Sequence, residues 1–234
     1  MNLARMASWI HKWLALIVGV QVLFWVASGL FFALFPIEHV RSEHRIAETT
    51  PAALDASALA SPNEITALLR APPMKISYER DAAGRAVAVV EFAAGRPALV
   101  DLESKALLSP LGSEAATALA RAYVAQAPAV HSADLVEKET PEYRGALPAW
   151  RIAFDDAEGL AVYVAADTGR VTARRSDLWR VYDALWALHI MDWRDHENFN
   201  NGFLIAFSVM SLIVVIAGFV LFPYRLGWVR RRSG

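Results

Sequence analysis

Two stretches of the chain are almost uniformly apolar and predict helices that cross a membrane. Residues 13–35, "WLALIVGVQVLFWVASGLFFALF", run for 23 positions without a charge, and residues 203–222 run for 20 more. A helix needs about 20 apolar residues to cross a hydrocarbon layer of about 30 Å. Core helices of soluble proteins rarely lack charge on every face over such a length. We therefore expect transmembrane helices at residues 13–35 and 202–223.

The charged residues predict how these helices are oriented. The segments before residue 36 and after residue 201 hold six basic residues and no acidic ones, whereas residues 36–201 hold 17 basic and 24 acidic residues, a net charge of −7. Basic flanks stay in the cytoplasm, so the N-terminal segment (1–12) and the tail (224–234) are expected there. The first apolar run exceeds a signal-peptide core and lacks a small-residue cleavage site, which favours a retained anchor. In a Gram-negative bacterium the protein would lie in the inner membrane with a periplasmic middle region.

The middle region shows the same order of patterns twice. A linker at 36–60 precedes "SPNEITALLRA", where Ser61 and Glu64 form a capping box at a helix start. The extended runs "AVAVVEFA" and "RPALVDLESKALLS" complete a first unit at 61–110.

A second unit follows at 111–176. It begins with the helix "GSEAATALARAYVAQA", for which we expect Ser113 as the cap, and continues with three extended runs that end in "LAVYVAADTGRVTARR". Helices followed by turn-linked strands predict α+β units with antiparallel sheets. The alternation in "AWRIAF" and "LAVYVAA" predicts one buried and one wet face in each sheet.

Residues 177–201 predict a helix and turn that lead into the second apolar run. "SDLWRVYDALWALHIMDW" has an apolar and aromatic stripe suited to a helix in the outer membrane interface, and "NFNNG" is a plausible turn and helix start. In the first apolar run, Gln21 is polar and points to a partner helix, since intramembrane polar groups usually face protein.

These segments resemble a known family. "YVAADTGRVTAR" is similar to the closing hairpin of the PepSY module, and "HKWLALIVGVQVLFWVASGLFFAL" resembles the first helix of PepSY-associated transmembrane proteins. "LHIMDW", followed by a helix ending "GFVLFPYRL", resembles the last membrane segment of that family. The resemblance implies a membrane α+β protein in which two transmembrane helices flank a periplasmic tandem of PepSY-like α+β units.

Composition and motifs favour binding over catalysis. The chain has no cysteine, which excludes thiolate chemistry and cysteine-ligated iron–sulfur clusters. It has no nucleophile elbow, phosphate-binding loop, zinc-protease motif or dinucleotide fingerprint. We therefore expect no autonomous catalytic activity and no nucleic-acid partner.

Five of the six histidines lie near a predicted membrane boundary. Imidazole is a common axial ligand of b-type haem, which needs no cysteine. The candidate ligands are His11, His39, His44, His189 and His196.

The predicted topology limits which of these histidines could share a haem. It separates His11 from the others by the bilayer, so His11 would need a ligand from another subunit, such as His11 of a second copy. On the outer side, His39 or His44 could pair with His189 or His196. Two alternatives remain: histidines that sit at the interface without a cofactor, or a metal site in which Asp192 and Asp195 join His189 and His196.

Two functions follow from this reading. The first is an inner-membrane PepSY protein that acts as a binding, regulatory or accessory subunit of a membrane system. The alternative, which rests on the resemblance, is a b-type haem electron-transfer subunit related to ferric-siderophore reductases. The expected partners are the lipid bilayer, a second copy or another membrane protein, and a periplasmic peptide or redox partner.

Overall fold

The computed structural model describes residues 3–48, 53–55 and 59–226, which divide into two compact units. The helical unit combines the two ends of the chain, residues 1–36 and 181–234, and the sheet unit comprises residues 37–180. Parts of the linker (49–52 and 56–58) and the tail arginines Arg230, Arg231 and Arg232 lie outside the described residues.

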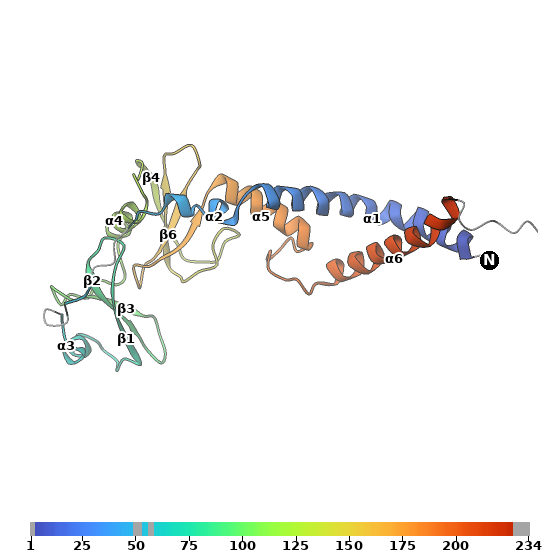
Figure 1. Cartoon of the computed structure of the whole chain (residues 1–234). Helices are drawn as coiled ribbons and strands as arrows, with labels where there is room; N and C mark the ends of the chain where they lie inside the picture. Colours follow the sequence, from blue (N-terminus) through green and yellow to red (C-terminus); the bar gives the residue numbers. More distant parts are fainter. Residues whose placement is uncertain (1–2, 49–52, 56–58, 227–234) are drawn as a thin grey trace, which may run out of the picture. The chain divides into compact units, whose positions relative to one another are not determined.

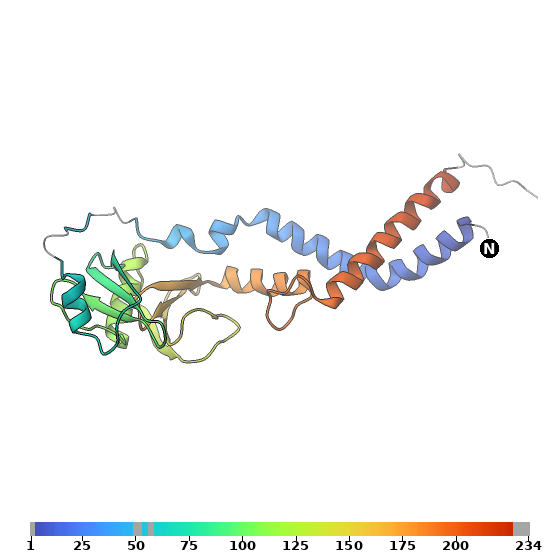
Figure 2. The ribbon, with the colours of Figure 1, turned by 90° about the horizontal axis from the view of Figure 1, so that it is seen from below.

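The helical unit contains α1 (Leu3–Leu34), most of α5 (Asp177–Ile190) and α6 (Gly202–Arg225). Two helices are long and apolar enough to cross a membrane, over Ser8–Leu34 and Gly202–Pro223, which confirms the two apolar helices expected from the sequence. Both views show α6 beside the N-terminal half of α1 and α5 beside its C-terminal half (Figures 1 and 2).

One asparagine, Asn201, links the end of α5 to the start of α6 by side-chain hydrogen bonds. The Asn201 side-chain oxygen accepts a hydrogen bond from the Leu204 amide at 2.9 Å, which caps α6. The Asn201 side-chain amide donates to the Ile190 carbonyl at 2.8 Å, where α5 ends. The helix start expected at Asn-Asn-Gly is therefore confirmed, and the same residue ties the two helices together.

The first module of the sheet unit, residues 61–110, is a helix followed by three strands. α3 (Pro62–Ala67) precedes β1 (Lys75–Arg80), β2 (Ala86–Glu91) and β3 (Ala98–Asp101), which form an antiparallel sheet in the order β1-β2-β3. The capping box of Ser61 and Glu64 is present as expected. The sequence pattern did not reveal β1, whose residues "KISYER" are mostly polar.

The second module, residues 111–176, is a helix followed by four strands. α4 (Ser113–Tyr123) leads to β4 (Val130–Val136), β5 (Ala149–Phe154), β6 (Ala161–Ala165) and β7 (Val171–Arg175), an antiparallel sheet in chain order. The expected cap Ser113 is wrong by one residue. Gly112 holds the extended cap conformation, Ser113 is already helical, and no side chain caps this helix.

The two modules share one hydrophobic core. Val89 and Leu99 of the first sheet pack in the same cluster as Leu119 of α4 and Val162 and Val164 of β6. Neither module therefore encloses this core alone.

The expectation that each sheet has one wet face is wrong for both sheets. In the first sheet, all four residues of β3 and four consecutive residues of β2 are buried, and in the second sheet all five residues of β6 are buried. The face of Tyr163 that points away from the shared core is covered by Tyr143, whose ring stacks on it at 4.4 Å.

The chain is anchored to the second module on both sides of the first module. After α2 (Ile37–Val40) and the short 3-10 helix η1 (Glu43–Arg45), the Ala47 amide donates to the Tyr123 carbonyl at 2.9 Å. Arg45 donates to the Asp156 carboxylate at 2.8 Å. After the first module, the Leu111 amide donates to the Ala166 carbonyl at 2.7 Å. Residues 48–110 thus leave the second module and return to it.

Candidate functional site

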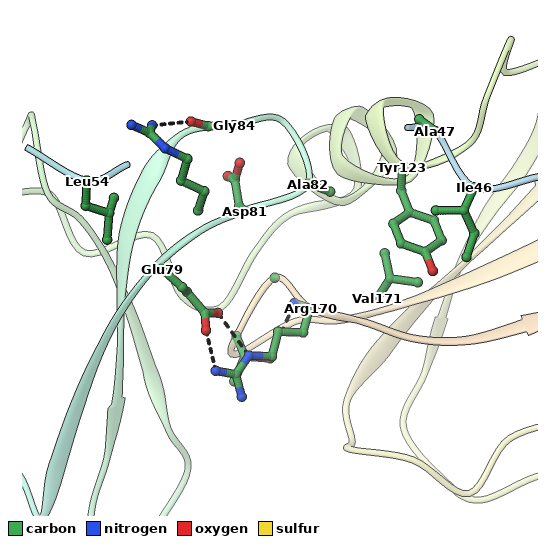
Figure 3. A pocket seen from close by; sticks show the side chains of 13 residues that line it. Ile46, Ala47, Leu54, Glu79, Asp81, Ala82, Gly84, Tyr123, Arg170 and Val171 are labelled. Carbon is green, nitrogen blue, oxygen red and sulfur yellow. Dashed lines mark hydrogen bonds and ion pairs between the residues drawn. The ribbon is translucent and has the colours of Figure 1, made fainter. Parts of the chain in front are cut away.

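A pocket of about 610 Å³ opens in the sheet unit between the end of β1 and the β6–β7 turn. Small-molecule sites typically occupy about 300–1,000 Å³, so this volume suffices for a ligand. Figure 3 shows Glu79 and Asp81 on one side and Ile46, Tyr123 and Val171 on the other. The lining comes from separate parts of the chain: Ile46 and Ala47, Leu54, residues 79–82 with Gly84, Tyr123, and residues 168–171.

The charged groups at the pocket are already engaged with one another. Arg170 donates two hydrogen bonds to Glu79, at 2.9 and 2.5 Å, and these bonds raise the pKa of Arg170 above its ordinary value. The Asp81 carboxylate accepts from the Ala83 and Arg85 amides and from the Arg85 guanidinium at 2.9–3.0 Å. The pocket therefore offers an apolar interior with a paired polar rim, which suits an apolar side chain better than a charged one.

A free sheet edge runs beside this pocket. Among the described residues, β1 has one strand neighbour, β2, so its other edge has no strand partner. Such an edge presents backbone N–H and C=O groups on which another extended segment can pair. Glu79 and Arg80, the last residues of β1, line the pocket. An added strand would thus run past the pocket opening.

A second polar site lies within the helical unit, where α1 meets the end of α5. The Gln21 side chain donates to the Leu188 carbonyl at 3.3 Å, and the Trp25 indole donates to the His189 carbonyl at 2.7 Å. The last carbonyls of a helix have no hydrogen-bond donor within the helix. Here Gln21 and Trp25 of α1 provide the donors for two such carbonyls of α5. The partner helix expected for Gln21 is therefore α5 of the same chain.

His189 itself is held by Ser28. The Ser28 hydroxyl donates to the Phe24 carbonyl at 2.7 Å and lies 2.7 Å from Nδ1 of His189. When the hydroxyl hydrogen is given to Phe24, Nδ1 of the neutral ring donates to Ser28 and Nε2 keeps its lone pair. Burial lowers the pKa of His189 below its ordinary value. The ring packs beside Phe32 and stacks on Trp186.

His196 lies in the loop between α5 and α6. Its Nδ1 is 2.6 Å from the Asp183 carboxylate, and its backbone carbonyl accepts from the Trp186 indole. Asp192 organises the same loop by accepting four backbone amides, those of Arg194, Asp195, Glu197 and Asn198. These bonds, led by that from Asn198, lower the pKa of Asp192 to about 2.

The backbone of this loop uses the Asp192 carboxylate, which was one of the candidate metal ligands together with Asp195, His189 and His196. Both oxygens of Asp192 are occupied by these amides, so they are not directed at a shared ion with His189. Within the described ranges, no group of three or more His, Asp or Glu side chains is arranged to hold a metal ion.

The remaining candidate histidines lie apart from this site. His11 packs against α6, with Nδ1 3.0 Å from the Val214 carbonyl, in the half of α1 away from His189. His39 and His44 belong to the sheet unit, where their rings stack at 4.2 Å. The structure thus brings His39 to His44, whereas the pairing of either with His189 or His196 stays a prediction.

Comparisons with family models, curated proteins and solved structures give no match to this chain.

Proposed function

We propose that this chain is a two-span membrane protein with both termini in the cytoplasm and a PepSY-like sheet unit outside, which binds an extended segment of a partner. The support for the two spans is the pair of apolar helices Ser8–Leu34 and Gly202–Pro223 together with the distribution of charge along the chain. In a Gram-negative cell the sheet unit would be periplasmic, and the protein would act as an accessory or regulatory subunit.

The observation that carries the binding function is the pocket beside the free edge of β1. A segment that pairs with this edge gains affinity from its backbone, and specificity from alternate side chains that enter pockets. Ile46, Leu54 and Val171 offer an apolar surface to one such side chain, while the Glu79–Arg170 pair borders it. The ligand class is therefore a peptide in extended form with an apolar anchor residue.

Site-specific photocross-linking in intact cells tests this proposal. A benzophenone amino acid replaces Val171 at the pocket and, as the matched control, Glu137, which is exposed outside the lining. We expect a discrete adduct from the Val171 position that is lost when Thr168→Trp fills the pocket. Adducts that form equally from the Glu137 position, or that persist in Thr168→Trp, would contradict a pocket-bound segment.

One observation favours b-type haem binding as a second candidate. Nε2 of His189 keeps its lone pair while Nδ1 is fixed by Ser28, the arrangement in which ligating histidines are usually held. His189 would hold the iron from the α5 side, and the bound haem would supply one-electron transfer. Ser28 orients the ring, and Phe32 and Trp186 limit the access of water to it.

An optical spectrum, reduced minus oxidised, tests this second candidate on protein purified in mild detergent after haem-supplemented expression. Resolved α and β bands that disappear in His189→Ala but remain in His131→Ala would support it, because His131 is an exposed residue of β4. A flat spectrum from folded protein would remove it.

A further inference from the structure

The linker before the first module carries one large apolar side chain, and that side chain lies at the pocket. Between Ile46 and Leu59 the sequence reads "AETTPAALDASA", in which Leu54 is the single Leu, Ile, Val, Met or aromatic residue. Leu54 is partly buried and lines the pocket (Figure 3), whereas its neighbours Ala53 and Asp55 are exposed. The chain therefore places at its own pocket the kind of side chain that the apolar interior suits.

A hydrogen bond to the backbone holds this part of the linker at the end of β1. The Arg80 guanidinium donates to the Ala53 carbonyl at 2.8 Å and to the Gly84 carbonyl at 2.8 Å. Arg80 is the last residue of the strand with which the proposed partner would pair. Any peptide backbone can offer such a carbonyl. Adjacent linker residues thus make the two contacts expected of the ligand class, a backbone carbonyl at β1 and an apolar side chain at the pocket.

The linker is fastened to the sheet unit on both sides of Leu54. Before it, the Ala47 amide donates to the Tyr123 carbonyl at 2.9 Å. After it, the Ala60 amide donates to the Leu102 carbonyl at 3.3 Å, and the Ala60 carbonyl accepts from the Tyr78 hydroxyl at 2.9 Å. A segment joined by short linkers to the body that carries its site competes at an effective concentration of about millimolar. Weak contacts by Leu54 therefore suffice to compete with a dilute partner.

We propose, on the basis of the peptide-binding function proposed above, that residues 53–55 are a built-in competitor at this pocket. Leu54 takes the place of the partner's apolar anchor, and the Ala53 carbonyl takes that of a partner carbonyl, so a partner binds by displacing both. The apparent affinity of the partner falls in proportion to the fraction of molecules in which the pocket is free. A partner with a smaller or polar anchor gains less from the pocket than Leu54 loses, so the competitor also narrows the range of segments that bind.

The photocross-link from the Val171 position measures this competition in the full chain. Leu54→Ser removes the apolar contact and should raise the yield of the Val171 adduct several-fold. Leu54→Met keeps an apolar side chain and should leave the yield close to that of the wild type. Leu68→Ser is the matched control and should change nothing, because Leu68 is a surface leucine of the first module, 41% exposed, that lies outside the pocket lining.

A second readout needs no partner. The benzophenone amino acid replaces Leu54 in the purified full chain in mild detergent, and mass spectrometry identifies the peptides to which it becomes joined within the same molecule. We expect links to the lining segments 79–84 and 168–171. The same amino acid at position 68 should not link to the 168–171 segment.

Two results would overturn the competitor and leave the proposed function standing. One is a Val171 adduct yield that is unchanged or lower in Leu54→Ser, since a lower yield means that Leu54 contacts the partner instead of excluding it. The other is the absence of intramolecular links from position 54 to the pocket lining. Adducts that form equally from the Glu137 position, or no Val171 adduct in either the wild type or Leu54→Ser, would refute the proposed function and the competitor with it.

Discussion

Replacing Gly169 by alanine should destabilise the sheet unit through two separable costs. Gly169 lies in the β6–β7 turn with φ +68°, a left-handed conformation that costs an L-residue about 1–2 kcal/mol. An added Cβ would also lie 3.1 Å from Leu99 Cδ2 and 3.2 Å from Leu119 Cδ1. Overpacking of a closed core typically costs about 1–3 kcal/mol. The sum is a loss of about 2–5 kcal/mol in the free energy of unfolding.

Two other glycines separate these costs. Gly84 also has a positive φ, +80°, but no atom lies within 4 Å of its added Cβ, so Gly84→Ala should cost only the backbone strain. Gly112 has φ −77° and equally open surroundings, so Gly112→Ala should be close to neutral. The expected order of unfolding free energies is therefore wild type and Gly112→Ala, then Gly84→Ala, then Gly169→Ala.

Thermal unfolding of the full chain in mild detergent, followed by circular dichroism, measures this order. For a protein of this size about 1 kcal/mol shifts Tm by roughly 2–4 °C, so Gly169→Ala should lower the transition by roughly 4–20 °C. If Gly169→Ala melts together with Gly84→Ala, the turn does not press on Leu99 and Leu119, and the account of a shared core at this turn is wrong.

Three further changes probe the remaining contacts. Trp25→Phe keeps an aromatic ring but leaves the His189 carbonyl without its indole donor, and it should cost about 1–3 kcal/mol by thermal unfolding in detergent; a neutral result would show that this carbonyl has another partner. Arg45→Ala removes the donor to the largely buried Asp156 carboxylate and should cost about 2 kcal/mol in the same assay, whereas Arg45→Lys should recover part of the loss. Asp192 has its pKa lowered from 3.8 to about 2, so its contribution to loop stability is complete above pH 3.8 and is lost as the pH falls toward 2; pepsin cleavage of the α5–α6 loop should rise over this window in wild type but start high and stay flat in Asp192→Asn.

Local signals in the sequence predicted the features that depend on neighbouring residues. The two apolar helices, the capping box at Ser61 and the helix start after Asn201 each depend on residues within one continuous stretch of sequence. The sequence pattern did not predict the strand β1, because Ile76 and Tyr78 are its only apolar residues. Its extended conformation depends on pairing with β2.

The candidate sites depend on residues far apart in the chain. Trp25 and His189 are separated by 164 positions and Ser28 and His189 by 161, so the stripe on α5 was interpreted as a surface for lipid, although Tyr182, Trp186 and His189 pack against Phe32 of α1. The pocket likewise joins separate segments with no common motif. Neither arrangement leaves a local pattern, because each residue looks like an ordinary surface or core residue among its neighbours in sequence.

The anchoring of Ala47 and Leu111 to the second module has a mechanical consequence. Because residues 48–110 leave and rejoin the second module at Tyr123 and Ala166, tension applied at β1 would pass into the second module before it reaches either of the two long apolar helices. Arg45 and Asp156 lie on the route toward α1, and β7 continues directly into α5. A pull applied at β1 would therefore be divided between α1 and α5 rather than borne by one helix. The force at which the sheet unit unfolds would then depend on the weakest of the contacts that hold these segments to the second module, such as the hydrogen bonds of Ala47 and Leu111.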